Sequence, residues 1–207
     1  MEVEARFLIR ELVEGLTYLQ AEGVLHRDIK VCNLMLTDTL HLKIGDFGLA
    51  TRAQSGLVQR HSSVCGTPNY MPPEVIKKLA YSFEVDVWSS GVLLFNLLAG
   101  RCPFTGETQK DTYENIVALR YRMPDNLSLS AQDLLRRMLC PKQRDRIRLE
   151  AILAHPFLSG FTPSSLPLRC FEVEVPESEL VAMSNKDSPF KEAEENLAPI
   201  GENKQEI

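Results

Sequence analysis

The pattern of apolar and polar positions predicts a helix at the start of the chain, followed by short strands. Residues 2–22 carry apolar side chains at three- and four-residue steps, as one face of a helix does, and Gly23 ends the pattern. Residues 24–45 contain short apolar runs and one alternating stretch, so we expect short strands around a loop. The apolar positions of the first helix are Val3, Phe7, Leu8, Leu12, Leu16 and Leu19.

Further along the chain, the pattern predicts several more helices. Residues 84–98 are apolar nearly all round, which indicates a buried central helix, and Gly100 is placed to end it. Ser130, with Asp133 three residues later, resembles a capping box. Residues 49–73 show no periodicity, and irregular segments of this length are commonly functional or disordered. Other helices are expected at about 107–119, 131–139 and 148–154.

The distribution of charged residues indicates that most of the chain is nearly neutral and that its C-terminal end is acidic. The chain has 207 residues, 44% of them hydrophobic, which suffices for one domain with a sizeable core. From Phe171 onward there are 10 Asp or Glu and 3 Lys or Arg, against 18 and 20 before that point. The balanced body argues against nucleic acid as a partner. Residues 176–207 are polar and rich in Glu, Pro and Ser, so we expect a disordered tail.

Several classes of protein are excluded by what the sequence contains. The cysteine count is five and no C-x-x-C pair occurs, so a disulfide framework or zinc site is not expected, and a reducing compartment fits best. The charged start from Glu2 is unlike a signal peptide. The longest apolar run, residues 85–99, is too short and too polar to span a bilayer, so we expect an intracellular protein without a membrane partner. Three histidines are expected to be structural or exposed: His41, His61 and His155.

The first stretch that carries chemistry is His-Arg-Asp-Ile-Lys-Val-Cys-Asn at positions 26–33. It matches the pattern H-R-D-x-x-x-x-N of kinase catalytic loops. Phosphoryl transfer needs a carboxylate to orient the substrate hydroxyl and oxygen ligands for magnesium. Asp28 suits the first task and Asn33 the second. The alternative is a surface turn in which Asp28 merely caps the backbone.

The second stretch is Asp-Phe-Gly at positions 46–48, thirteen positions after Asn33. The tripeptide alone is commonly a turn, and its distance from the catalytic loop makes it specific. Asp46 is expected to bind magnesium that bridges ATP phosphates.

With Cys-Gly-Thr-Pro-Asn-Tyr and Pro-Pro-Glu, the chain resembles the C-terminal lobe of eukaryotic protein kinases, most closely the polo-like kinases. The resemblance covers about residues 3–170. It implies the α+β protein-kinase-like fold, C-terminal lobe only, mainly helical with short strands around the catalytic loop. It also implies a catalytic-domain lobe at 1–160 and a family-like extension at 161–175. The stretches that carry it are 43–51, 65–70, 72–74, 82–89 and 160–167.

The resemblance also implies roles for individual residues. Lys30 is expected to contact the ATP γ-phosphate, Thr67 to bond Asp28 and Lys30, and Met35 to lie under the adenine. Lys30 and the stretch 66–68 imply phosphorylation of Ser or Thr in protein substrates.

Three more residues are expected to hold the lobe together. Glu74 is expected to pair with Arg146 in a buried tie, the alternative being a surface ion pair worth little. Asp86 is expected to hold the catalytic loop from the start of the central helix, the alternative being an ordinary helix-start carboxylate.

Regulation and location are likewise implied by the resemblance. Ser63, which follows Ser62, aligns with the activating phosphosite, an upstream kinase would phosphorylate it, and Arg27 is the expected phosphate partner with Arg60 nearby. The family resemblance implies the cytoplasm or nucleus, including the centrosome or spindle.

A kinase places a Gly-rich loop and a strand Lys before the catalytic loop, and here 25 residues precede His26, without any G-x-G-x-x-G. We therefore expect the chain alone to be inactive, and its face over residues 24–48, with Met35 and Phe47, to expose apolar surface. Three hypotheses stay open: a fragment of an active kinase, a non-catalytic binding or regulatory protein, and a lobe that works with an N-lobe supplied in trans.

Overall fold

The computed structural model describes residues 2–52 and 64–160, and within them the chain is mainly helical, as predicted. The predicted extension at 161–175 and tail at 176–207 lie outside the described residues. The helices are α1 (Glu2–Ala21), α2 (Pro73–Ile76), α3 (Glu84–Ala99), α4 (Gln109–Val117), α5 (Leu129–Met138) and α6 (Leu149–Leu153). The strands are β1 (Val24–Leu25), β2 (Leu34–Leu36), β3 (Leu42–Ile44) and β4 (Thr51–Arg52). The 3-10 helices are η1 (Val31–Asn33), η2 (Pro68–Tyr70) and η3 (Gln143–Asp145).

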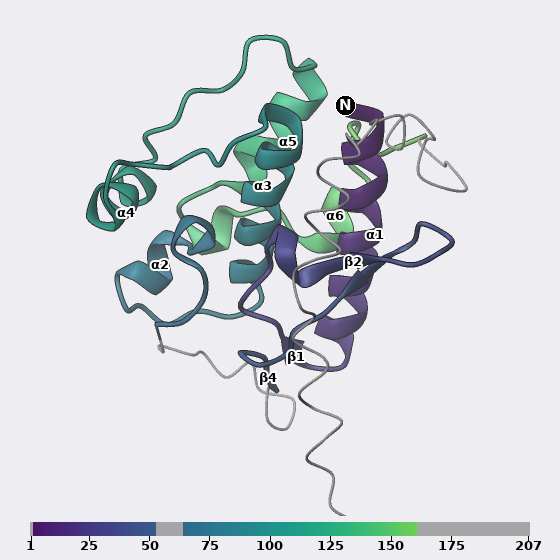
Figure 1. The fold of residues 1–207 in the computed structure, drawn as a ribbon, viewed down its shortest axis with the longest axis horizontal. Helices are drawn as coiled ribbons and strands as arrows, with labels where there is room; N and C mark the ends of the chain where they lie inside the picture. The colour runs from purple at the N-terminus through teal and green to yellow at the C-terminus, as the bar shows by residue number, and fades with distance from the viewer. Residues whose placement is uncertain (1, 53–63, 161–207) are drawn as a thin grey trace, which may run out of the picture. The chain divides into compact units, whose positions relative to one another are not determined.

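Helix α3 forms the centre of the core, with α1 and α5 packed against it (Figure 1). Every residue from Val85 to Phe95 is buried, as the continuous apolar pattern predicted. Trp88 of α3 stacks on Phe104 with ring centroids 5.5 Å apart, which extends the core toward α4. Gly100 adopts the left-handed conformation at φ 69° and ends the helix, again as predicted.

Helix α1 forms as predicted, and Phe7, Leu12 and Leu16 of the predicted apolar face are buried, but the buried face is only partly the predicted one. Ile9 and Val13 are fully buried, whereas Val3 is 45% exposed. The reason is the helical period of about 100° per residue, which places position 3 far around the axis from the stripe through Ala5, Ile9 and Val13. That stripe packs on α3 and α6.

The predicted cap at Ser130 is wrong. Helix α5 starts at Leu129, and its cap is Ser128, whose hydroxyl accepts a hydrogen bond from the Ala131 amide at 3.2 Å. The carboxylate of Asp133 is used elsewhere, by Arg137 and His155. A capping box does occur at α4, where Thr108 and Asp111 satisfy each other's amides.

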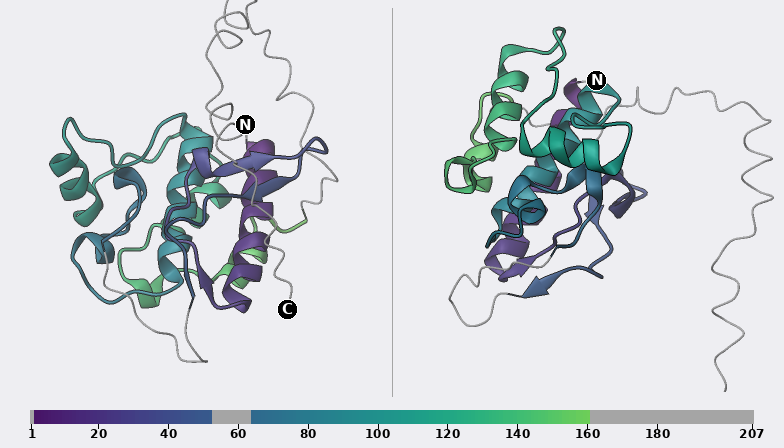
Figure 2. Two further views of the ribbon diagram at one scale, coloured as in Figure 1. Left: turned by 60° about the horizontal axis from the view of Figure 1, so that its bottom comes forward. Right: turned by 90° about the vertical axis from the view of Figure 1, so that its left-hand side faces the viewer.

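The strands pair in two short antiparallel sheets near α1. Strands β2 and β3 pair in a hairpin that packs on α1 (Figure 2). Strand β1 pairs with β4, so that Leu25 lies opposite Thr51. The segment 49–73 was predicted to be irregular throughout, and its described parts instead contain β4, η2 and the start of α2. These elements are too short to produce a period in the sequence.

Candidate active site

The loop at 26–33 is fastened to the central helix by one buried carboxylate. Asp86, in the first turn of α3, accepts hydrogen bonds from the His26 amide at 2.9 Å and the Arg27 amide at 2.8 Å. Burial raises the pKa of Asp86, while the two backbone amides oppose that rise because they stabilise the anion. The expected contact between Asp86 and the loop is therefore present.

Three side chains converge on the carboxylate of Asp28. Lys30 Nζ lies 2.6 Å from Oδ2, and Asn33 Nδ2 lies 3.1 Å from the same oxygen. Thr67 donates to Oδ1 from its hydroxyl at 2.8 Å and from its amide at 3.0 Å. Asp28 is 6% exposed, so this carboxylate is held in one place by charge-assisted hydrogen bonds.

The same contacts fix the charge of Asp28. Burial alone would raise its pKa, but hydrogen bonds from Lys30 and Thr67, together with the Lys30 charge, hold the pKa below its usual value. The hydrogen bond to Asp28 in turn raises the pKa of Lys30. At neutral pH the two side chains form an ion pair, so Asp28 presents an anion that orients a hydroxyl group strongly.

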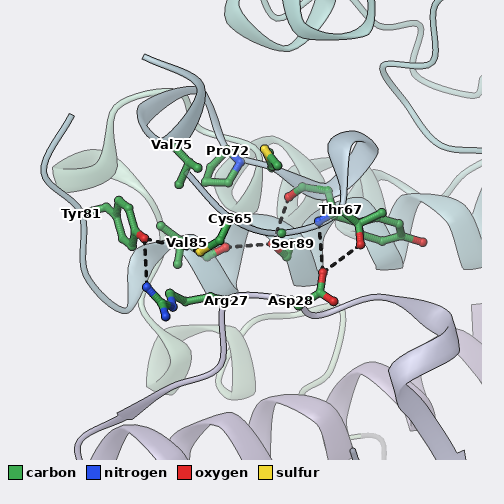
Figure 3. A pocket seen from close by; sticks show the side chains of 12 residues that line it. Arg27, Asp28, Cys65, Thr67, Pro72, Val75, Tyr81, Val85 and Ser89 are labelled. Atoms are coloured by element: carbon green, nitrogen blue, oxygen red, sulfur yellow. Dashed lines mark hydrogen bonds between the residues drawn. The ribbon is translucent and has the colours of Figure 1, made fainter. Parts of the chain in front are cut away.

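A glycine allows the segment bearing Thr67 to reach the catalytic loop. Gly66 has φ 110°, and a Cβ at this position would lie 2.9 Å from the carbonyl oxygen of Arg27. Figure 3 shows the resulting pocket, with Asp28 and Thr67 at one end and Val75 and Tyr81 at the other. Its free volume is about 10 Å³, room for about one water molecule.

Asn33 and Asp46 are the oxygen ligands expected for magnesium, and their surroundings fit that role. The Gly45 amide donates to the Asn33 carbonyl at 2.8 Å, which holds the start of the Asp-Phe-Gly stretch beside η1. Both side-chain hydrogen bonds of Asn33 use Nδ2, so its Oδ1 is the atom suited to a metal. Asp46 is exposed at φ 58°, with Oδ1 3.2 Å from the Gly48 amide.

No group of three or more His, Cys, Asp or Glu gathers within the described ranges. An ion held by these two residues would therefore complete its shell with nucleotide phosphates and water, which is how Mg²⁺ is usually bound.

Met35, expected under the adenine, lies on strand β2. Its side chain is 58% exposed, and its Cε would lie 2.7 Å from a Cβ placed at Gly45. The Met35 side chain therefore lies over Gly45, on the exposed side of the β2–β3 hairpin. Phe47, nearby in sequence, is 47% exposed. The prediction that Met35 and Phe47 expose apolar surface is confirmed.

Sequence reasoning missed two residues of the site. His26 is fully buried, its Nε2 lies 3.0 Å from the Gly45 carbonyl, and its ring contacts Phe47 edge-to-face at 5.0 Å. His26 thus connects the catalytic-loop motif to the Asp-Phe-Gly stretch. Its position in the H-R-D motif could have identified it from the sequence. Tyr81 has its hydroxyl 3.5 Å from Arg27 Nη1 and 3.8 Å from Cys65 Sγ, and no pattern in the sequence indicated it.

The expected tie between Glu74 and Arg146 forms, and it is buried. Nη1 lies 2.7 Å from Oε1 and Nη2 lies 3.0 Å from Oε2, with side-chain exposures of 0% for Arg146 and 2% for Glu74. Arg146 also donates to the carbonyls of Glu84 and Cys140 and lies over the Trp88 ring. This pair joins α2 to η3.

The expected regulatory residues are described only in part. Arg27 Nε donates to the Leu49 carbonyl at 2.7 Å, which places the guanidinium beside the segment after Asp-Phe-Gly. Ser63, with Arg60, His61 and Ser62, lies outside the described residues.

The remaining histidines and cysteines have structural or exposed positions. His155 is buried with Nε2 3.0 Å from Asp133, and His41 is exposed with Nδ1 2.6 Å from Glu11, as predicted. Cys32, Cys65, Cys102 and Cys140 are free thiols. Across 2–52 and 64–160, no helix has both the length and the apolar character needed to cross a bilayer.

Comparison with known proteins agrees with the geometry. The family model of the protein kinase domain matches residues 1–158. The serine/threonine-protein kinase PLK4 of Drosophila ananassae is 38% identical over 212 residues, covering 96% of this chain and 27% of that protein. The serine/threonine-protein kinase polo of Drosophila melanogaster is 44% identical over 171 residues, covering 82% of this chain and 29% of that protein.

The chain thus spans between a quarter and a third of the length of these relatives. The catalytic-loop geometry and the match of the family model over residues 1–158 lead to one conclusion: this chain belongs to the protein kinase domain family.

Proposed function

We propose that residues 2–160 are the C-terminal lobe of a polo-type protein kinase, which transfers the ATP γ-phosphate to Ser or Thr of protein substrates. The observation that carries this proposal is the convergence of Lys30, Asn33 and Thr67 on Asp28. A surface turn with a capping Asp would need neither the lysine nor a contact from a segment 39 positions away. The polo-type assignment rests on the relatives named above.

In this proposal, Asp28 accepts the hydrogen bond of the substrate hydroxyl and then its proton. Its anionic state at neutral pH and its fixed position orient the hydroxyl oxygen toward the phosphoryl group. Lys30 lies where its charge can offset charge on the transferred group. Magnesium supplies charge neutralisation of the phosphates when it is bound, with Asn33 Oδ1 and Asp46 as its protein ligands.

The substrate peptide is proposed to lie over Thr67, whose hydroxyl donates to Asp28. The pocket beside Thr67, between Met71, Val75 and Val85, has room for about one water molecule and not for a side chain. A peptide lying over Thr67 would place its Ser or Thr hydroxyl near the carboxylate.

ATP binding is proposed to need an N-terminal lobe that covers Met35 and Asp46. The exposed Met35 side chain would contact one face of the adenine. We expect the chain alone to be inactive, because its described residues include no strand with a lysine that could cover the nucleotide. The 207-residue chain alone is therefore expected to bind Mg-ATP very weakly and to phosphorylate no protein measurably.

Titration calorimetry with Mg-ATP and a radiolabel assay on casein test this proposal. In a polo-type relative, a further lobe would precede the region that matches this chain. A fusion of that lobe to this chain is expected to phosphorylate casein, and Asp28→Asn is expected to abolish that activity. A fusion that binds Mg-ATP but transfers no phosphate would overturn the proposed activity and favour a binding or regulatory protein. Micromolar Mg-ATP binding by the chain alone would contradict the need for the covering lobe.

Ser63 is proposed as the site at which an upstream kinase activates the protein. The support is the position of Arg27, whose guanidinium lies beside Leu49 and Tyr81 near the catalytic loop. A phosphate adds about 1.5–2 negative charges and would pair with that guanidinium. Hydrogen exchange over residues 64–70 should slow after phosphorylation, and Arg27→Ala should remove the effect. Unchanged exchange would exclude Ser63 as a switch.

The protein is proposed to act inside the cell, in the cytoplasm or nucleus, including the centrosome or spindle. Protein kinases act on intracellular proteins, and the relatives named above are polo and PLK4 kinases.

A further inference from the structure

We infer that a basic ridge on this lobe, away from Asp28, docks an acidic peptide segment of a protein partner. The ridge consists of five exposed cationic side chains from two segments of the chain: Lys77, Lys78, Lys142, Arg144 and Arg148. The inference does not depend on the proposed catalysis, because it concerns binding alone.

Outside the ridge, most cationic side chains in the described part of the chain pair with a carboxylate. Four of the five cations of the ridge do not. Arg6, Arg10, Arg122 and Arg137 each pair with an acid three or four residues away. Within residues 2–52 and 64–160, no ion pair engages Lys77, Lys78, Lys142 or Arg148. Arg144 reaches only its neighbour Asp145, at 3.8 Å, and its side chain is 82% exposed. Among the described residues, therefore, no carboxylate pairs with four of the five cations of the ridge.

The two segments are held side by side by specific contacts. Gln143 Nε2 donates to the Ala80 carbonyl at 3.0 Å, which connects η3 to the loop after α2. The buried pair of Glu74 and Arg146 connects the same two regions from inside. Cations that are more than 60 positions apart in sequence thus share one surface.

The loop that carries Lys77 and Lys78 is fixed by its backbone. The Lys78 amide donates to the Val75 carbonyl at 3.0 Å, and the Leu79 amide donates to the Glu74 carbonyl at 2.8 Å. Lys78 adopts the left-handed conformation at φ 55°, which turns the chain. A ridge whose backbone is already ordered loses less entropy when it binds a partner.

An apolar side chain and a hollow lie next to the charges. Leu79 is 52% exposed between the lysines and Ala80. The hollow has a volume of about 550 Å³ and is lined by Phe83, Gln143, Arg144 and Arg148, among others. A peptide with alternating acidic and uncharged residues would meet the cations with one set of side chains and Leu79 with the other.

The hollow also contains a carboxylate oxygen that a peptide backbone could satisfy. Glu84 and Glu150 line it, and Glu84 Oε2 is buried without a hydrogen-bond partner among the described residues. Rotation of the half-exposed Glu84 side chain would offer this oxygen to a backbone N–H, which a peptide supplies at nearly every residue.

The test uses the full chain and fluorescein-labelled decapeptides of glutamate and alanine with one central leucine. A second peptide has glutamine in place of glutamate, and a third has phosphoserine. The glutamate or phosphoserine peptide should bind in a salt-sensitive manner, and the tighter of the two identifies carboxylate or phosphate as the preferred anion. Lys77→Glu with Lys142→Glu should weaken binding about tenfold or more, and Leu79→Ser should weaken it by about threefold.

Arg122→Glu is the matched control, because Arg122 is 82% exposed and precedes α5. Ser128, at the end of that loop, bonds Glu2 at the start of α1, whereas the hollow includes Gln20 near the other end of that 20-residue helix. Arg122→Glu should change affinity by less than about twofold. Equal binding of the glutamine peptide, an equal loss in Arg122→Glu, or tighter binding of anionic vesicles or single-stranded RNA through the same lysines would overturn the inference.

Discussion

Arg146 places its planar guanidinium among acceptors from three parts of the chain. It pairs with both carboxylate oxygens of Glu74 and donates to the carbonyls of Glu84 and Cys140, while its plane lies over Trp88. This use of the fork geometry explains why a lysine could not replace it, since an ammonium group cannot make the same set of planar hydrogen bonds. Each of the two charges is stabilised only while the other is present, because either partner alone would be an unpaired buried charge.

Arg146→Ala should therefore be strongly destabilising. Removing the guanidinium leaves the Glu74 carboxylate buried without its partner, and breaking such a pair costs about 3–5 kcal/mol. Urea unfolding followed by circular dichroism measures the change. The control is Arg137→Ala, whose ion pair with Asp133 is exposed on α5 and should contribute less than about 1 kcal/mol. Similar losses in the two variants would contradict the structural role assigned to Arg146.

Asp28 should show a lowered pKa that depends on Lys30. The unfolded carboxyl titrates near its ordinary value and the folded one below it, so its stabilising contribution is present above about pH 4 and is lost as the pH falls through the folded pKa. Lys30→Met removes a hydrogen bond and a charge, so it should move the pKa of Asp28 upward. Carboxyl ¹³C shifts measured between pH 6 and pH 2 report both values. An unchanged titration in Lys30→Met would disprove the coupling.

At the scale of elements, the site depends on contact between the catalytic loop and the segment before η2. The Thr67 amide and hydroxyl reach Asp28 because Gly66 lets the backbone pass close to Arg27. Asp86 holds the other side of the loop to α3. The loop is thus positioned from two elements, and neither contact is local in sequence.

Gly66→Ala should separate this segment from the loop. The new Cβ would lie 2.9 Å from the Arg27 carbonyl at φ 110°, where strain costs at least about 1–3 kcal/mol. Hydrogen exchange of the Thr67 amide should become faster, because its bond to Asp28 is lost. Gly100→Ala is the control, since it also has positive φ but meets nothing within 4 Å, and it should destabilise without changing exchange at Thr67. Normal Thr67 protection in Gly66→Ala would show that the segment tolerates a side chain.

At the scale of the whole described structure, several apolar side chains near the catalytic loop are exposed. Val31, Met35, Leu36, Phe47 and Leu49 are each between 37% and 58% exposed and come from η1, β2 and the Asp-Phe-Gly region. Three of them, Val31, Met35 and Leu36, line one apolar hollow, and exposed apolar surface that gathers in this way usually marks an interface. It is the face that the proposed N-terminal lobe would cover.

The isolated chain should accordingly bind a hydrophobic dye and self-associate. Replacing Met35 and Leu36 together by Gln should lower dye fluorescence and shift sedimentation toward the monomer. Leu129→Gln is the control, because Leu129 is 84% exposed at the start of α5, away from the catalytic loop, and should leave both readouts nearly unchanged. A chain that is monomeric and dye-negative would indicate that the exposed face has no tendency to associate.

Local sequence determined the elements with a clear period and the residues of the chemical motifs. A continuous apolar run and a glycine predicted helix α3 and its end at Gly100. This was possible because a helix buried on all sides has apolar residues at nearly every position. The motif at 26–33 and the stretch at 46–48 indicated Asp28, Asn33 and Asp46 as candidates for the proposed phosphoryl transfer, because that reaction restricts which residue types can stand there.

Only the tertiary structure decided which side chains meet and which surfaces stay open. The role of Tyr81 beside Arg27 and the short strand β4 depend on neighbours distant in sequence, which leave no local period. The basic ridge arises in the same way, since the Gln143–Ala80 hydrogen bond and the Glu74–Arg146 pair join two segments that are far apart in sequence. Hydrophobic periodicity reports whether a residue is buried, whereas hydrogen-bond partners are chosen by the packing of whole elements.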